Sequence, residues 1–133
     1  MSAFQALRRW AATSTRAHVA FAFLAMGGWA VFANRNHPLG EALLAGIVQG
    51  AVSAFLTLVL KKALEWMSRQ WRGWGALLLP PLITASAIMA ILQIAHRAAG
   101  TPEIWATIAV PFTVSTSYAI IYNWGLWSRG DGS

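Results

Sequence analysis

The chain has 133 residues, of which 57% are hydrophobic and only 11% are charged. Soluble domains carry about 25% charged residues, so this composition excludes an ordinary water-soluble domain, because too little charge is present to cover its surface. It also excludes a disordered chain, which would be poor in apolar residues. The net charge of +6 is typical of nucleic-acid binding. Basic loops beside membrane spans explain it better, and we expect no nucleic-acid partner.

Residues 1–17 predict a cytoplasmic amphipathic segment. Phe4, Leu7 and Trp10 alternate with Arg8 and Arg9, a composition typical of helices that lie along lipid headgroups.

Four apolar stretches follow, and none contains a charged residue. A helix needs about 20 apolar residues to cross a bilayer. The approximate spans are 18–33, 42–60, 75–95 and 104–124, which together form a transmembrane domain over 18–127 followed by a cytoplasmic tail over 128–133. The first span has an alternative interpretation as a signal peptide, because basic residues precede it and Val31-Phe32-Ala33 resembles a cleavage site.

The connections between spans predict how the helices are arranged. The outer ones, 34–41 and 96–103, are short, and short connections join antiparallel neighbours. We therefore expect an all-α integral membrane protein with four transmembrane helices in an antiparallel bundle of two helical hairpins. The longer inner loop, 61–73, is amphipathic and is expected to continue the second helix along the headgroups.

Basic residues predict the orientation of the bundle. With the N-terminus inside, eight of the ten basic residues are cytoplasmic: Arg8, Arg9, Arg16, Lys61, Lys62, Arg69, Arg72 and Arg129. Only Arg35 and Arg97 are then outside, which is a strong positive-inside signal. We expect both termini in the cytoplasm of a bacterium, an inner-membrane location, and contacts with anionic headgroups on the cytoplasmic face.

The two hairpins show weak similarity to each other. A shift of 62 residues places Arg35 on Arg97 and Glu41 on Glu103. A parallel internal duplication would give this pattern, and chance similarity between apolar helices is the alternative.

The second span carries small residues at every fourth position: Ala42, Gly46, Gly50 and Ala54. Such a face lets two helix backbones approach closely, so it predicts helix packing. It also suggests that the protein forms a homo-oligomer or is a subunit of a larger membrane complex.

Uncharged polar side chains occur at similar depth in three spans and form a candidate ligand-binding centre: Gln49, Ser53, Thr84, Ser86, Ser115, Ser117 and Tyr118. The alternatives are a hydrogen-bonded packing seam for Gln49 and Ser53 and hydroxyls that bond to their own helix carbonyls.

A second group of polar residues is predicted at the outer ends of the spans: Arg35, His37, Glu41, His96, Arg97 and Glu103. This outer polar cluster could bind an anionic headgroup or a partner, and salt-bridged loop caps are the alternative. The histidines are expected at the membrane boundary with access to solvent.

The expected function is transport-related: the protein would bind or pass a lipid or small amphipathic molecule through the polar centre. The alternative is a non-catalytic accessory, assembly or immunity-type subunit of a membrane complex. We expect no enzyme activity, since no catalytic constellation is visible. No cofactor and no metal are expected, and the absence of cysteine removes thiolate sites.

Overall fold

The protein is described from a computed structural model, which gives the backbone of residues 2–131 and the side chains of residues 2–10 and 14–130. This part of the chain is entirely helical: α1 (Ala3–Thr13), α2 (Thr15–Ala33), α3 (Leu39–Ser68), α4 (Trp74–Ala99), α5 (Ile104–Leu126) and a π-helical turn, Trp127–Asp131. Four segments are long and apolar enough to span a membrane: α2, α3, α4 and Ile104–Gly130. The all-α class and the membrane-spanning character are therefore confirmed. The predicted tail, 128–133, lies partly outside the described residues.

The observed helices extend beyond the predicted spans, most of all in α3. At about 1.5 Å per residue, its 30 residues make a helix of about 45 Å, whereas the hydrocarbon core of a bilayer is about 30 Å thick. The apolar stretch thus marks only the part of a helix that can lie in lipid. Helical hydrogen bonding continues through Lys61 and Lys62 to Ser68.

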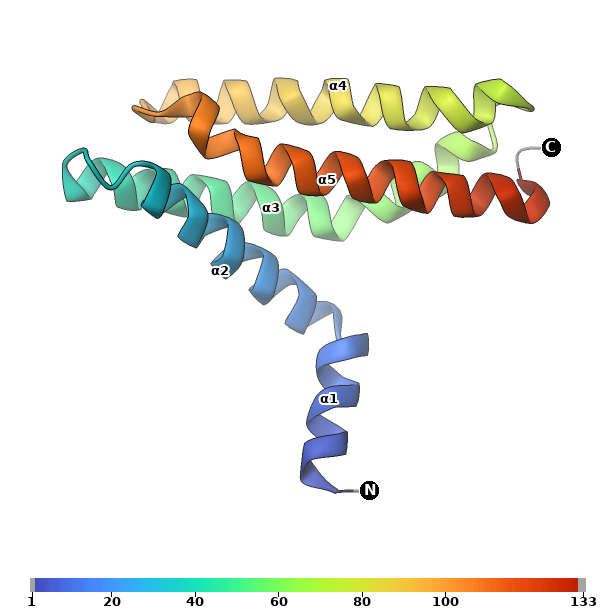
Figure 1. The fold of residues 1–133 in the computed structure, drawn as a ribbon, viewed down its shortest axis with the longest axis horizontal. Helices are drawn as coiled ribbons and strands as arrows, with labels where there is room; N and C mark the ends of the chain where they lie inside the picture. The colour runs from blue at the N-terminus through green and yellow to red at the C-terminus, as the bar shows by residue number, and fades with distance from the viewer. Residues whose placement is uncertain (1, 132–133) are drawn as a thin grey trace.

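Two ends of the molecule can be distinguished in Figure 1. The connections α2–α3 and α4–α5 lie together at one end, here called the turn end, and the connection α3–α4 lies with the end of α5 at the other, here called the loop end. Gly100 ends α4 at the turn end with a φ of 72°, a left-handed conformation that glycine adopts without a steric penalty.

The core is formed by α3, α4 and α5. In α4 every fourth residue is buried: Ala76, Pro80, Thr84, Ile88, Leu92 and His96. Residues four apart are neighbours on a helix surface, so these side chains form one continuous stripe along α4. Ile88 and Leu92 pack with Leu56, Leu60 and Leu64 of α3 and with Ile108 and Ala119 of α5. Apolar side chains thus occupy much of the space between these three helices.

Glycines bring α2 into close contact with α3. A Cβ atom added to Gly27 would lie 2.8 Å from the carbonyl oxygen of Gly46, and one added to Gly50 would lie 3.0 Å from the ring of Phe23. Part of the predicted small-residue face thus lies against α2 of the same chain. Ala42 is buried and Ala54 is partly buried.

Towards its N-terminus, α2 diverges from α3, and α1 continues away from the other helices (Figure 1). Ser14 separates α1 from α2: its backbone is extended (ψ 124°), and its hydroxyl accepts a hydrogen bond from the amide of Ala17. Phe4, Leu7 and Trp10 of α1 are more than half exposed. By contrast, α4 and α5 pack along each other. The two hairpins differ in shape, which gives no support to the predicted duplication.

Candidate functional site

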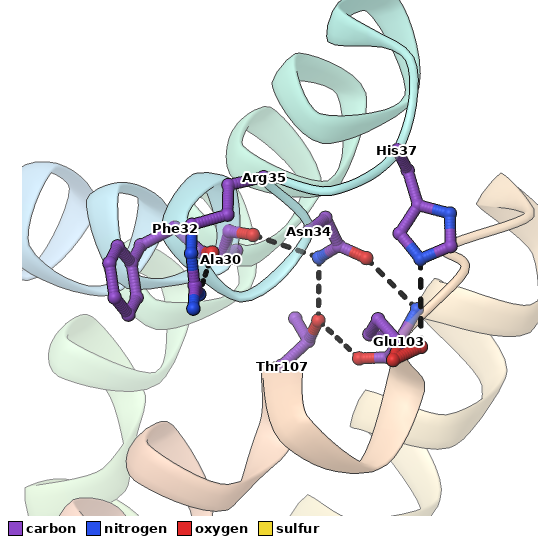
Figure 2. Close-up of polar contacts among 7 residues, drawn as sticks. All are labelled: Ala30, Phe32, Asn34, Arg35, His37, Glu103 and Thr107. Carbon is purple, nitrogen blue, oxygen red and sulfur yellow. Dashed lines mark hydrogen bonds and ion pairs between the residues drawn. The ribbon is translucent and has the colours of Figure 1, made fainter.

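A polar junction at the turn end joins α2 to α5 (Figure 2). The buried amide of Asn34 donates 2.8 Å hydrogen bonds to the carbonyl of Ala30 and to the hydroxyl of Thr107. Its Oδ1 atom accepts the backbone amide of Glu103 at 2.9 Å. This amide precedes the first turn of α5, where backbone donors have no partner within the helix. Asn34 therefore fastens the end of α2 to the start of α5. The sequence analysis missed it, although Asn after a helix and before a turn is a common capping residue.

The outer polar cluster is not one site. His37 and Glu103 form an ion pair, with 3.6 Å between Nε2 and Oε2. Arg35 instead lies over the ring of Phe32, 4.0 Å from its centroid. The remaining exposed members also lack a common target, since Arg97 donates to Gln93 and Glu41 lies in the first turn of α3. Among the described residues, no three potential ligands are grouped closely enough for a metal ion.

His96 is fully buried, and the prediction of an exposed outer histidine was wrong. Its Nε2 atom lies 2.7 Å from Oε1 of Gln49, and its Nδ1 atom lies 2.8 Å from the hydroxyl of Thr101. Gln49 also donates to Ser53 at 2.9 Å. The reason is that α4 continues past residue 95 and keeps its last turn packed on α3. These side chains are buried and serve as one another's hydrogen-bond partners.

The candidate polar centre does not assemble. Thr84 donates to the carbonyl of Pro80 in its own helix, and Ser86 is exposed and donates to Leu82. Ser117 and Tyr118 are exposed, and Ser115 is partly exposed. Of the seven predicted residues, the structure joins only Gln49 and Ser53 directly. The physical reason is that a hydroxyl in an apolar helix can bond to the carbonyl one turn earlier, which requires no partner helix.

Asn123 is a second polar residue that the sequence analysis missed. It is fully buried in α5 and donates to the carbonyls of Ala76 and Leu77 in α4, both at 2.9 Å. These carbonyls would normally accept the amides four residues later, at positions 80 and 81. Both positions are proline and have no amide hydrogen. Asn123 therefore replaces the hydrogen bonds that the two prolines remove.

An apolar groove lies where α2 diverges from α3. It has a volume of about 640 Å³ and is open over much of its surface. Val19, Ala20, Phe23 and Leu24 of α2 line it, with Leu58 of α3 opposite.

The two ends of this groove differ. Because the ring of Phe23 lies over Gly50, the close contact between α2 and α3 closes the end nearer the turn end. Thr15 and Arg16, at the start of α2, line the other end. The groove is therefore lined almost entirely by apolar atoms, and a basic residue, Arg16, lies at one end of it.

The residues that line the groove are mainly apolar. Its lining residues provide no carboxylate, imidazole or thiol that could transfer a proton or attack a substrate. The chain matches no known protein-family model, and it matches no curated protein and no solved structure significantly.

Proposed function

We propose that this protein is a lipid-binding membrane protein that holds an acyl chain in the groove between α2 and α3. The observation that carries the proposal is the groove itself. It is an apolar groove of about 640 Å³ with a basic residue, Arg16, at one end. Its opening lies between two helices that are each long and apolar enough to span a membrane. An amphipathic molecule matches both parts of the groove.

In this proposal the lipid is bound in the groove and does not pass through the helix bundle. An apolar cluster occupies much of the interior between α3, α4 and α5, and the predicted polar centre is dispersed. The groove lies outside this core, on the side covered by α2.

We propose further that the helices form an antiparallel bundle with both termini in the cytoplasm, in a bacterial inner membrane. The distribution of basic residues supports this orientation. The crosswise position of α1 in Figure 1 suits an amphipathic helix in the plane of the inner headgroups. Thiol labelling tests the orientation cleanly because the chain has no cysteine. N36C should react only from outside and S128C only from inside, and the reverse would refute it.

An accessory or assembly subunit is the second candidate, and one observation favours it. Only 11% of the apolar window of α2 is buried within the chain, compared with 39% for α3. A second copy or another subunit could therefore pack on α2. The mass of the detergent-solubilised particle decides this point. A monomer argues against self-association. A stable dimer whose contact covers the groove favours the accessory-subunit function over lipid binding.

Native mass spectrometry of the purified protein tests lipid binding. The wild type should retain about one phospholipid per chain. A20W places an indole ring in the groove and should reduce retention at least tenfold. A90W is the matched control, since Ala90 is an exposed alanine on α4 away from the groove, and it should retain lipid like the wild type. No retained lipid in the wild type, or equal retention in both variants, would refute the proposal.

A further inference from the structure

We infer that the groove selects an anionic phospholipid, whose phosphate is bound by Arg16 together with Lys61 and Lys62. This inference rests on the proposed function and adds the chemistry of the headgroup.

The first support is the position of the three basic residues. Arg16 lines the mouth of the groove, and Leu58 lines its opposite wall. Lys61 and Lys62 follow Leu58 by three and four residues, so both lie near its face of α3, one turn towards the loop end. Arg16 thus lines the groove itself, and Lys61 and Lys62 lie on α3 one turn beyond its wall.

The second support is that these basic groups have no partner in the protein. Within the part of the chain that the structure describes, Arg16, Lys61 and Lys62 form no hydrogen bond or ion pair. The nearest carboxylate along α3 is that of Glu65, and it accepts the hydroxyl of Tyr122 at 2.6 Å. Grouped cations beside an apolar wall favour an anion there, because the attraction is stronger where less water screens it.

The third support comes from the start of α2. The hydroxyl of Ser14 accepts the amide of Ala17, which leaves the backbone amides of Thr15 and Arg16 without acceptors in the described chain. The first-turn amides and the helix dipole both favour an anion at this position. The residues that carry these amides, Thr15 and Arg16, both line the groove.

A phospholipid fits the whole site, whereas a free phosphate would use only its mouth. The acyl chain would lie along Val19, Phe23 and Leu24, and the phosphate would lie at the level of Arg16. A zwitterionic headgroup brings its own cation to the same three basic residues, so it should bind more weakly than an anionic one.

The test compares the retention of phosphatidylglycerol and phosphatidylcholine with identical acyl chains, using the full-length protein and native mass spectrometry. The wild type should prefer phosphatidylglycerol by about tenfold, since each basic residue near an anionic headgroup adds to the free energy of binding. This preference should fall as the salt concentration is raised. R16Q/K62Q should lose the preference and still retain phosphatidylcholine.

R69Q/R72Q is the matched control. It removes two positive charges from the nearby α3–α4 connection and should keep the preference. Equal loss in both double variants would show diffuse surface charge and overturn the inference, as would equal retention of the two lipids by the wild type. Failure to retain either lipid would instead overturn the proposed function, so the two failures can be distinguished.

Discussion

At the scale of single residues, two asparagines connect helices that are distant in sequence. Asn34 joins α2 to α5, and Asn123 joins α5 to α4. Each is fully buried and serves backbone groups that would otherwise have no partner. Buried polar groups without partners are costly, so these contacts stabilise the packing of the helices.

Asn123 allows the most specific test at this scale. N123L keeps a similar volume but leaves the carbonyls of Ala76 and Leu77 unpaired, so the free energy of unfolding should fall by about 2 kcal/mol. In a P80A/P81A background, new amides can pair with these carbonyls within α4, and N123L should then cost much less. Unfolding in mild detergent measures both values. An equal loss in the two backgrounds would contradict the role assigned to Asn123.

At the scale of elements, the membrane helices could be predicted from the sequence, and their packing could not. Each apolar stretch appears as a helix because the tendency to enter lipid depends mainly on the local sequence. The interior faces depend on neighbouring helices. His96 illustrates the difference, since it follows the last apolar residue of its span and is buried only because α4 continues along α3.

The candidate site, too, could be predicted from the sequence only in part. The small residues of the second span indicated a close helix contact, and the structure places Gly46 and Gly50 against α2. The groove beside this contact could not be predicted, because it results from the divergence of α2 from α3. Ser86 and Ser117 were grouped with Gln49 by depth alone, and depth does not determine which way a side chain points.

The contact between α2 and α3 predicts different effects at two adjacent glycines. G27A would place a methyl group 2.8 Å from the carbonyl oxygen of Gly46, whereas a methyl group at Gly28 meets nothing within 4 Å. G27A should lower the free energy of unfolding by about 1–3 kcal/mol. G28A should be neutral or raise it by up to about 1 kcal/mol, since alanine favours a helix more than glycine does. Thermal unfolding of both variants checks this, and equal effects would show that the glycine contact is not tight.

At the scale of the whole molecule, the helices are joined by hydrogen bonds at the turn end and separate from one another along α2. The turn end is held by the Asn34 junction and by a 2.9 Å hydrogen bond from Trp29 to the carbonyl of Ala106. From there α2 diverges from α3 and α1 continues beyond it (Figure 1). The groove is lined by residues of this diverging part of α2 and by Leu58 of α3. In this arrangement the apolar groove lies outside the core formed by α3, α4 and α5. This is the physical basis for proposing that the protein binds a lipid without passing it through its centre.

Photolabelling in a bilayer tests the central claim, that a lipid acyl chain occupies the groove. A phosphatidylglycerol with a diazirine in its acyl chain would be incorporated with the protein into vesicles and irradiated, and the labelled peptides would be mapped by mass spectrometry. Label should concentrate on residues 19–24 and around Leu58. Leu82 and Ile94 of α4 are also largely exposed, at 62% and 69%, and should carry much less. Equal labelling of α4 and the groove would mean that lipid only surrounds the protein and would contradict the account.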